Sequence, residues 1–264
     1  MIVLTLNWFG MAVHDVPAAS DFYSQRLGFS FLEDETNSLW RQFQTRCMTF
    51  ELFQAHPQRL MVNAWGDGQA FRPFILVDKL SAAIDMLQSQ NISFSQPESS
   101  FGKILEMVGP EKIRWSLMES TDIQIDWAHP TIGGIELKAV NLDAQKAFYT
   151  EILGMTLERG VEGTLLLSQP DEMARLLIHT GGVFTHPPAP AGEEKPAYFY
   201  PIWISFETQD VKHANVWLKQ QNAVILHPLT YHEDWNGTDI ILADADGNAV
   251  QVVQYGKVDG LEHQ

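Results

Sequence analysis

The chain has 264 residues, which is long enough for one large domain or for two domains of ordinary size. Apolar residues make up 45% of the sequence and charged residues 19%, and these proportions argue against a fibrous or largely disordered chain. The formal net charge of −16 repels phosphate backbones and anionic lipid surfaces, so we expect neither nucleic acid nor a membrane as a partner.

The start of the chain lacks the basic segment and the small-residue cleavage site of a secretory signal. It is predicted to be a strand instead. No apolar run approaches the roughly 20 residues that span a bilayer. Cys47 is the single cysteine, which excludes an internal disulfide and a thiolate metal cluster. We therefore expect a cytoplasmic protein in which Cys47 is a small buried side chain.

The first elements are an alternating strand that runs to Val13, a short polar turn and an amphipathic helix. Phe22 and Arg26 lie one helical turn apart, which places the aromatic ring on the face that meets the sheet. Gly28 follows the helix at once, where a residue with positive φ lets the chain turn back into another strand.

The same pattern returns in the second half of the chain. Phe148 and Gly154 lie 126 residues after Phe22 and Gly28, and both aromatics are followed by tyrosine. Self-similarity at a fixed offset indicates a duplicated unit. The sequence therefore predicts two halves of about that length.

A weaker copy of the strand-helix-strand pattern follows within each half. In the first half we expect a strand over 71–77 and a helix over 79–90. In the second half we expect a strand over 200–207, a helix over 210–221 and a strand from 223 to 227. Each half is thus predicted to contain two βαβββ units.

These features resemble the vicinal oxygen chelate superfamily, which includes glyoxalases, bleomycin-resistance proteins and extradiol dioxygenases. The resemblance rests on the helix-borne Phe-Tyr pairs, the Leu-Gly helix ends and the turn Asp244-Ala-Asp-Gly-Asn248 before the last strand. Ala245 replaces the proline that the family has in this turn. The resemblance covers residues 2–128 and 132–256.

The resemblance implies an α+β fold of four βαβββ units. They would pair into two tandem domains, 1–128 and 132–264, each a U-shaped mixed sheet around a ligand cup with its helices outside. His129, Pro130 and Thr131 would link the domains. The proline-rich segment 183–199 would be a surface loop, either a plain connector or a lid over a cup.

Metal-dependent relatives place a ligand on the first and on the last strand of each unit. By resemblance, these positions hold Trp8, Glu51, Arg72 and Asp126 in the first domain, and Gly134, Leu177, Trp203 and Gln251 in the second. A divalent catalytic ion needs lone pairs from imidazole or carboxylate. Indole offers only an N–H, guanidinium repels a cation and a Gln amide is a weak donor, so we expect no metal and no other cofactor.

Two groups of charged residues leave alternatives open. Arg72 with Glu51 and Asp126 forms a structural ion-pair cluster, an anchor for an anionic or carbonyl-bearing ligand, or a metal site. Glu136 and Lys138 share one face of their strand, where Glu136 is either a base or hydrogen-bond acceptor partnered by Lys138, or one half of a solvent-facing charge pair.

Tryptophan is abundant, with 8 residues, and Trp8 and Trp203 are inferred to line the cups. Aromatic walls with a few polar anchors suit flat organic ligands. The 9 histidines are scattered, and the nearest pair, His227 and His232, lies on either side of a proline, which is weak evidence for a metal.

The sequence thus predicts a metal-free small-molecule-binding protein of the glyoxalase/bleomycin-resistance type, acting as a monomer or homodimer on a small organic ligand, aromatic or anionic. The alternative is a metal-dependent lyase, isomerase or dioxygenase of the same superfamily, using Glu51 and Asp126 with a metal or Glu136 as general base. A third hypothesis is an interaction module that has lost both cups.

Overall fold

A computed structural model describes residues 4–32, 40–55, 71–97, 102–120, 130–169, 172–182, 202–233, 235–256 and 258. Within these ranges the chain forms four consecutive βαβββ units, as the repeat predicted. Asp126 and the proline-rich segment 183–199, for which a lid was one expectation, lie outside the described residues.

The first half of the chain supplies two units. The first consists of β1 (Thr5–Val13), α1 (Val16–Asp21) with a π-helical turn (Phe22–Arg26), β2 (Ser30–Leu32), β3 (Trp40–Gln44) and β4 (Thr49–Gln54). The second consists of β5 (Phe71–Val77), α2 (Leu80–Ser89), β6 (Phe94–Ser95), β7 (Ile104–Val108), a 3₁₀ turn (Pro110–Lys112) and β8 (Arg114–Glu119). The strand predicted over 71–77 is confirmed at both ends.

The second half supplies the other two units. The third consists of β9 (Thr131–Ala139), α3 (Leu142–Ala147) with a π-helical turn (Phe148–Ile152), β10 (Thr156–Val161), β11 (Thr164–Ser168) and β12 (Arg175–Thr180). The fourth consists of β13 (Ile202–Glu207), α4 (Val211–Gln220), β14 (Val224–His232), β15 (Gly237–Ala243) and β16 (Ala249–Tyr255). The strand expected from 223 to 227 is longer than predicted, because β14 continues five residues beyond His227.

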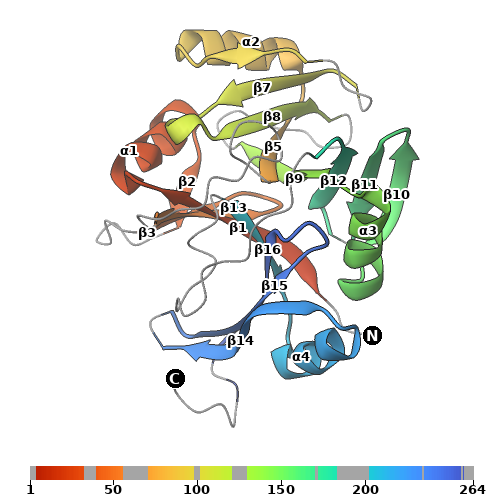
Figure 1. Ribbon diagram of the computed structural model, residues 1–264. Helices are drawn as coiled ribbons and strands as arrows, with labels where there is room; N and C mark the ends of the chain where they lie inside the picture. The colour runs from red at the N-terminus through yellow and green to blue at the C-terminus, as the bar shows by residue number, and fades with distance from the viewer. Residues whose placement is uncertain are drawn as a thin grey trace.

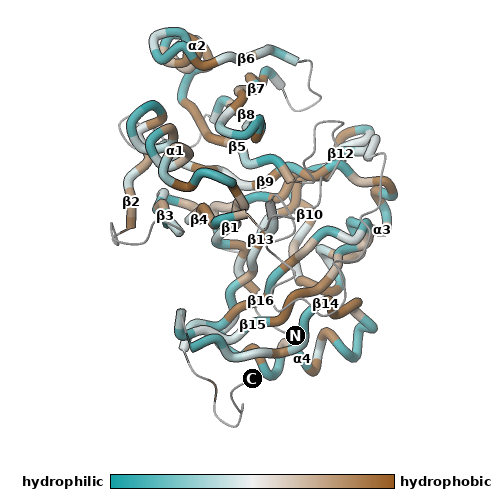
Figure 2. Tube along the Cα trace, turned by 60° about the vertical axis from the view of Figure 1, so that its left-hand side comes forward, coloured by the Kyte–Doolittle hydropathy of each residue, from teal (hydrophilic) through white to brown (hydrophobic). Residues whose placement is uncertain are grey.

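Local chemistry fixes the helix ends. The side chains of Asp15, Asn141 and Asp210 each accept a hydrogen bond from the backbone N–H three residues later, which caps three of the helices. Gly28 and Gly154 have φ of 78° and 77°, as their positions after the helices predicted. Helices α2 and α4 alternate hydrophilic and hydrophobic residues (Figure 2), so each has one side suited to packing on strands.

The strands form two mixed sheets of eight (Figure 1). Sheet A has the order β14-β15-β16-β13-β1-β4-β3-β2, and sheet B has the order β10-β11-β12-β9-β5-β8-β7-β6. In every unit the first strand runs parallel to the last, and the two units of a sheet join through their antiparallel first strands. The predicted fold class, four βαβββ units in mixed sheets with helices outside, is confirmed.

The pairing of the units differs from the tandem order that the repeat suggested. Sheet A combines the first unit with the fourth, and sheet B combines the second with the third. Each sheet therefore takes one unit from each half of the chain, and the halves 1–128 and 132–264 do not coincide with the sheets. Residues predicted for two separate cups are regrouped as a consequence.

The two units within a half meet through a hydrophobic core instead. In the first half the Tyr23 ring lies 5.4 Å from Phe50 and 5.3 Å from Trp115 between ring centroids, and Trp115 Nε1 donates to the Tyr23 hydroxyl at 3.1 Å. Phe9 of β1 packs edge-on against Trp115 of β8. Tyr23 is fully buried, whereas Phe22, the expected core residue, is only half-buried, because the π-helical turn rotates the tyrosine inward.

The second half repeats this contact. Tyr149 is fully buried and donates its hydroxyl to Asp244 Oδ2 at 3.1 Å. Asp244 also accepts from the backbone N–H groups of Asp246 and Asn248, which closes the Asp-rich turn. Burial raises the pKa of Asp244 to about 6. The turn recognised in the sequence therefore ties the fourth unit to the helix of the third.

Two further expectations concern single features. Cys47 is half-buried rather than fully buried, and burial raises the pKa of its thiol to about 11. Among the helices of the described ranges, none combines the length and the apolar character that a membrane crossing requires.

Candidate functional site

The junction of β1 with β13 and β4 assembles a group of side chains that we call site A. Its members are Trp8, Glu51, Trp203, Ser205 and Gln251. Trp8 stands opposite Ser205, which in turn stands beside Gln251, while both Trp203 and Glu51 are register partners of Gly10. Register partners point to the same side of a sheet, as do residues two apart on one strand, so site A occupies a single face.

Gly10 makes room for the indoles of site A. A Cβ atom on Gly10 would lie 2.2 Å from the Trp203 ring, closer than any carbon contact allows. The Trp8 and Trp203 rings meet edge to face with 6.4 Å between centroids. A glycine inside a strand is the sequence signal for such a close approach, and our sequence analysis did not use it.

Glu51 is the one acidic member of site A. It is 7% exposed, and its Oε1 accepts a hydrogen bond from Gln42 Nε2 at 3.0 Å. Burial raises the pKa of Glu51 to about 8, so the carboxyl is mainly protonated at neutral pH and can donate a hydrogen bond. Trp8 Nε1 is buried and has no hydrogen-bond partner within the described ranges.

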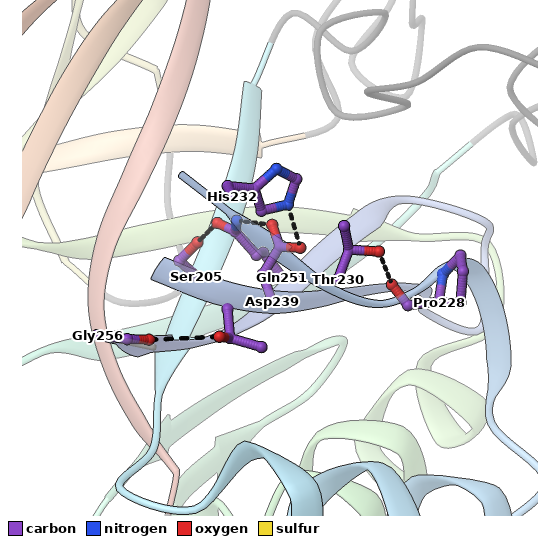
Figure 3. Close-up of polar contacts among 8 residues, drawn as sticks. Ser205, Pro228, Thr230, His232, Asp239, Gln251 and Gly256 are labelled. Atoms are coloured by element: carbon purple, nitrogen blue, oxygen red, sulfur yellow. Dashed lines mark hydrogen bonds and ion pairs between the residues drawn. The ribbon is translucent and has the colours of Figure 1, made fainter. Parts of the chain in front are cut away.

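A chain of hydrogen bonds leads from site A to the outer hairpin β14–β15 (Figure 3). Ser205 Oγ donates to Gln251 Oε1, and Gln251 Nε2 donates to Asp239 Oδ2, each at 2.5 Å. Asp239 Oδ1 lies 2.9 Å from His232 Nε2. Gln251 therefore connects the centre of sheet A with the carboxylate of the hairpin.

The hairpin carries a group that the sequence analysis did not predict. One potential ligand atom from each of His227, His232 and Asp239 falls within 4.8 Å of the other two. Burial lowers the pKa of His227, which favours its neutral, lone-pair-bearing form. The sequence placed the histidines five residues apart but gave no sign of Asp239, because the register of β14 on β15 brings it to them.

The positions that the resemblance assigned to metal ligands hold groups that do not suit a metal ion. The pairing of the first and fourth units brings four of these positions together in site A, where they hold Trp8, Glu51, Trp203 and Gln251. Indole nitrogens donate and do not coordinate, Gln251 already engages both amide atoms, and Glu51 is mainly protonated. One carboxyl group is too few for a catalytic divalent ion at this place.

Sheet B holds a second charged group, which we call site B: Arg72, Glu106, Glu136 and His179. Arg72 Nη1 pairs with Glu106, whose other oxygen lies 3.5 Å from Arg114 Nη1. Glu136 stands beside Arg72 across β5 and β9, and its Oε2 lies 3.7 Å from His179 Nε2. Arg72 and Glu136 are 3% and 1% exposed, whereas Glu106 and His179 are half-buried, so site B is an ion-pair cluster with a buried centre.

Site B corrects two expectations. Arg72 does not meet Glu51, because the two residues belong to different sheets, and its observed carboxylate partner is Glu106. Glu136 is buried, so the solvent-facing reading of Glu136 is wrong, whereas Lys138 on the same face is half-buried. Leu177 is part of the buried interior.

Position 134 requires glycine because of its backbone conformation and the lack of space for a side chain. Its φ is 152°, and a Cβ atom there would lie 1.9 Å from the Arg175 carbonyl oxygen. Asp126, the remaining predicted site residue, lies outside the described residues. The structure thus places Trp8, Glu51, Trp203 and Gln251 together in sheet A, and Arg72, Glu136 and Lys138 in sheet B.

Comparison with known proteins agrees with this architecture. The sequence matches the family described as the glyoxalase/bleomycin resistance protein/dioxygenase superfamily over residues 5–102 and 131–252. Glyoxalase I from Zea mays is similar in structure, with a TM-score of 0.67 and 15% identity, covering 95% of this chain and 92% of that one. No curated protein matches the sequence.

A protein described as a putative dioxygenase from Bacillus subtilis is similar to the same extent. Its TM-score is 0.69 at 13% identity, and the match covers 96% of this chain and 86% of the other. At these identities the likeness concerns the fold.

Proposed function

We propose that this chain, which belongs to the glyoxalase/bleomycin resistance protein/dioxygenase superfamily, binds a small organic ligand at site A without a metal ion at the family positions. The observation that supports this most is the identity of the four side chains gathered there: two indoles, one amide and one mainly protonated carboxyl. Such a set binds organic molecules better than cations.

The chemistry of site A indicates the ligand class. The Trp8 and Trp203 rings are almost fully buried and meet edge to face, and a flat, aromatic ligand would pack against them. Protonated Glu51 donates a hydrogen bond, which suits a carbonyl oxygen on that molecule, and the net charge of −16 disfavours an anion. We therefore infer a neutral aromatic ligand that carries a carbonyl group.

Binding of aromatic aldehydes, ketones and amides tests the proposal. Each compound is titrated against the full chain by isothermal calorimetry, with quenching of tryptophan fluorescence as a second readout. Replacing Glu51 by Ala removes the donor and is expected to weaken binding of a carbonyl ligand about tenfold, which is the worth of one such hydrogen bond.

The matched control is Trp217→Phe. Trp217 lies on α4, away from site A, and donates Nε1 to the Ile152 carbonyl. This variant is expected to bind as the unchanged protein does. Loss of affinity in Trp217→Phe equal to that in Glu51→Ala, or the absence of any binding compound, would overturn the proposal.

A metal-dependent lyase, isomerase or dioxygenase is the second candidate, and the His227, His232 and Asp239 group favours it. Under this candidate the bound compound is converted, and conversion requires an added divalent ion. Product analysis of the binding compounds, with and without metal, separates an enzyme from a binding protein.

A further inference from the structure

We propose that His227, His232 and Asp239 bind a divalent transition-metal ion on the outer hairpin β14–β15, outside the positions that metal-dependent relatives use. All three residues lie on the second and third strands of the fourth unit, whereas the family ligands stand on first and last strands. The inference goes beyond the proposed ligand binding, and its test needs no organic ligand.

The geometry requires little rearrangement. The three ligand atoms lie within 4.8 Å of one another, and His232 Nε2 is 2.9 Å from Asp239 Oδ1. Ligand atoms at about 2.1 Å from a tetrahedral metal are about 3.4 Å apart. Small side-chain rotations on the fixed hairpin therefore bring all three atoms to bonding distance.

Neighbouring residues already hold two of the ligands in place. Gln251 Nε2 donates to Asp239 Oδ2, which leaves Oδ1 directed at His232, and Ser205 fixes the amide of Gln251. The Trp235 ring stacks on the His232 imidazole at 5.0 Å with 21° between planes. Hydrogen bonds and packing that orient ligands in this way are a regular feature of metal sites.

His227 provides an independent observation. Its Nε2 is buried and lacks a hydrogen-bond partner in the part of the chain that the structure describes. A buried polar nitrogen without a partner costs free energy, and an ion bound beside His232 would supply the missing partner. A structural His232–Asp239 pair alone leaves this nitrogen unexplained.

The donor set selects the class of metal. Two imidazole nitrogens and one carboxylate oxygen suit zinc, iron(II), cobalt, nickel and manganese, while calcium and magnesium prefer oxygen donors only. Three protein ligands leave coordination positions for water or a small molecule. The Asp239 carboxylate also supplies the negative charge that a cation needs.

Zinc binding to chelator-treated protein tests the proposal. Isothermal calorimetry with Zn²⁺ is expected to give one ion per chain, and Co²⁺ is expected to develop visible absorption bands on binding. His227→Ala and His232→Ala are each expected to weaken Zn²⁺ binding at least a hundredfold. Asp239→Asn keeps the shape of the side chain and is expected to do the same.

Two further variants make the result specific. His213→Ala removes an exposed histidine of α4 and is expected to leave Zn²⁺ binding unchanged. Gln251→Ala removes the donor that orients Asp239 and is expected to weaken binding about tenfold. Thermal unfolding in chelator shows whether each variant is folded. Absence of a one-to-one complex, or equal affinity in the His213 and His227 variants, would overturn the proposal.

Discussion

Replacing Glu51 by Gln changes how the stability of the protein depends on pH. The pKa of Glu51 is about 8 in the folded protein, whereas the ordinary value for a glutamate is 4.5. The folded state therefore binds this proton more tightly than the unfolded state does. The contribution of Glu51 to stability is therefore fully present below pH 4.5 and is lost as the pH rises through 8. Gln keeps an amide oxygen that accepts from Gln42 but does not titrate, so the fall disappears.

The size of the effect follows from the difference between the two pKa values. Between pH 5 and pH 8 the free energy of unfolding of the unchanged protein is expected to fall by roughly 3 kcal/mol through Glu51 alone. Over the same range the free energy of unfolding of Glu51→Gln is expected to rise by that amount relative to the unchanged protein. Urea unfolding at several pH values measures both proteins directly.

An exposed glutamate provides the control. Glu151 is solvent-exposed, and Glu151→Gln is expected to keep the slope of the unchanged protein. If Glu51→Gln and the unchanged protein lose stability in parallel from pH 5 to pH 8, Glu51 is ionised at neutral pH. Glu51 then does not serve as a hydrogen-bond donor in site A.

Three further substitutions probe packing and charge, each by urea unfolding. Gly10→Ala drives a methyl group into the Trp203 ring and is expected to cost about 1–3 kcal/mol; a neutral result would mean that the indole lies elsewhere. Arg72→Met removes a charged hydrogen-bond donor from Glu106, which keeps Arg114, and is expected to cost about 1.5–3 kcal/mol, whereas a cost below 1 kcal/mol would indicate an exposed pair. Tyr149→Phe deletes the hydroxyl that donates to the Asp-rich turn and is expected to cost about 1–2 kcal/mol, and no change would show that water replaces it.

Local features of the fold were predictable from the sequence. The 126-residue offset identified the repeated units, and Gly28 and Gly154 marked helix ends through their need for positive φ. The strand 71–77 and the helix over 79–90 followed from hydrophobic spacing. These signals are local, so a single sequence carries them.

The pairing of units was not predictable in this way. Each of the four units begins with a strand of similar hydrophobic pattern. The pattern therefore does not determine which two of these first strands pair with each other. The observed pairing of β1 with β13 moved Trp203 and Gln251 next to Trp8 and Glu51, and separated Arg72 from Glu51. Which residues share a site therefore depends on which units pair, and this pairing joins segments that are far apart in the sequence.

The group of His227, His232 and Asp239 also could not be predicted from the sequence, although its residues lie close together in the chain. Asp239 meets His232 because it pairs with Thr230, two residues before His232, whereas the register that places His227 is irregular between Ile225 and Thr230. Spacing along the chain gave the two histidines but not their carboxylate. Predicting such a site from sequence requires the strand register first.

Anomalous diffraction at the zinc edge, from crystals soaked in Zn²⁺, tests the central claim most directly. We expect a peak bonded to His227, His232 and Asp239, and no peak within coordination distance of Glu51 or Gln251. A zinc ion coordinated by Glu51 between the two indoles would contradict the account, since the family positions would then still hold a metal.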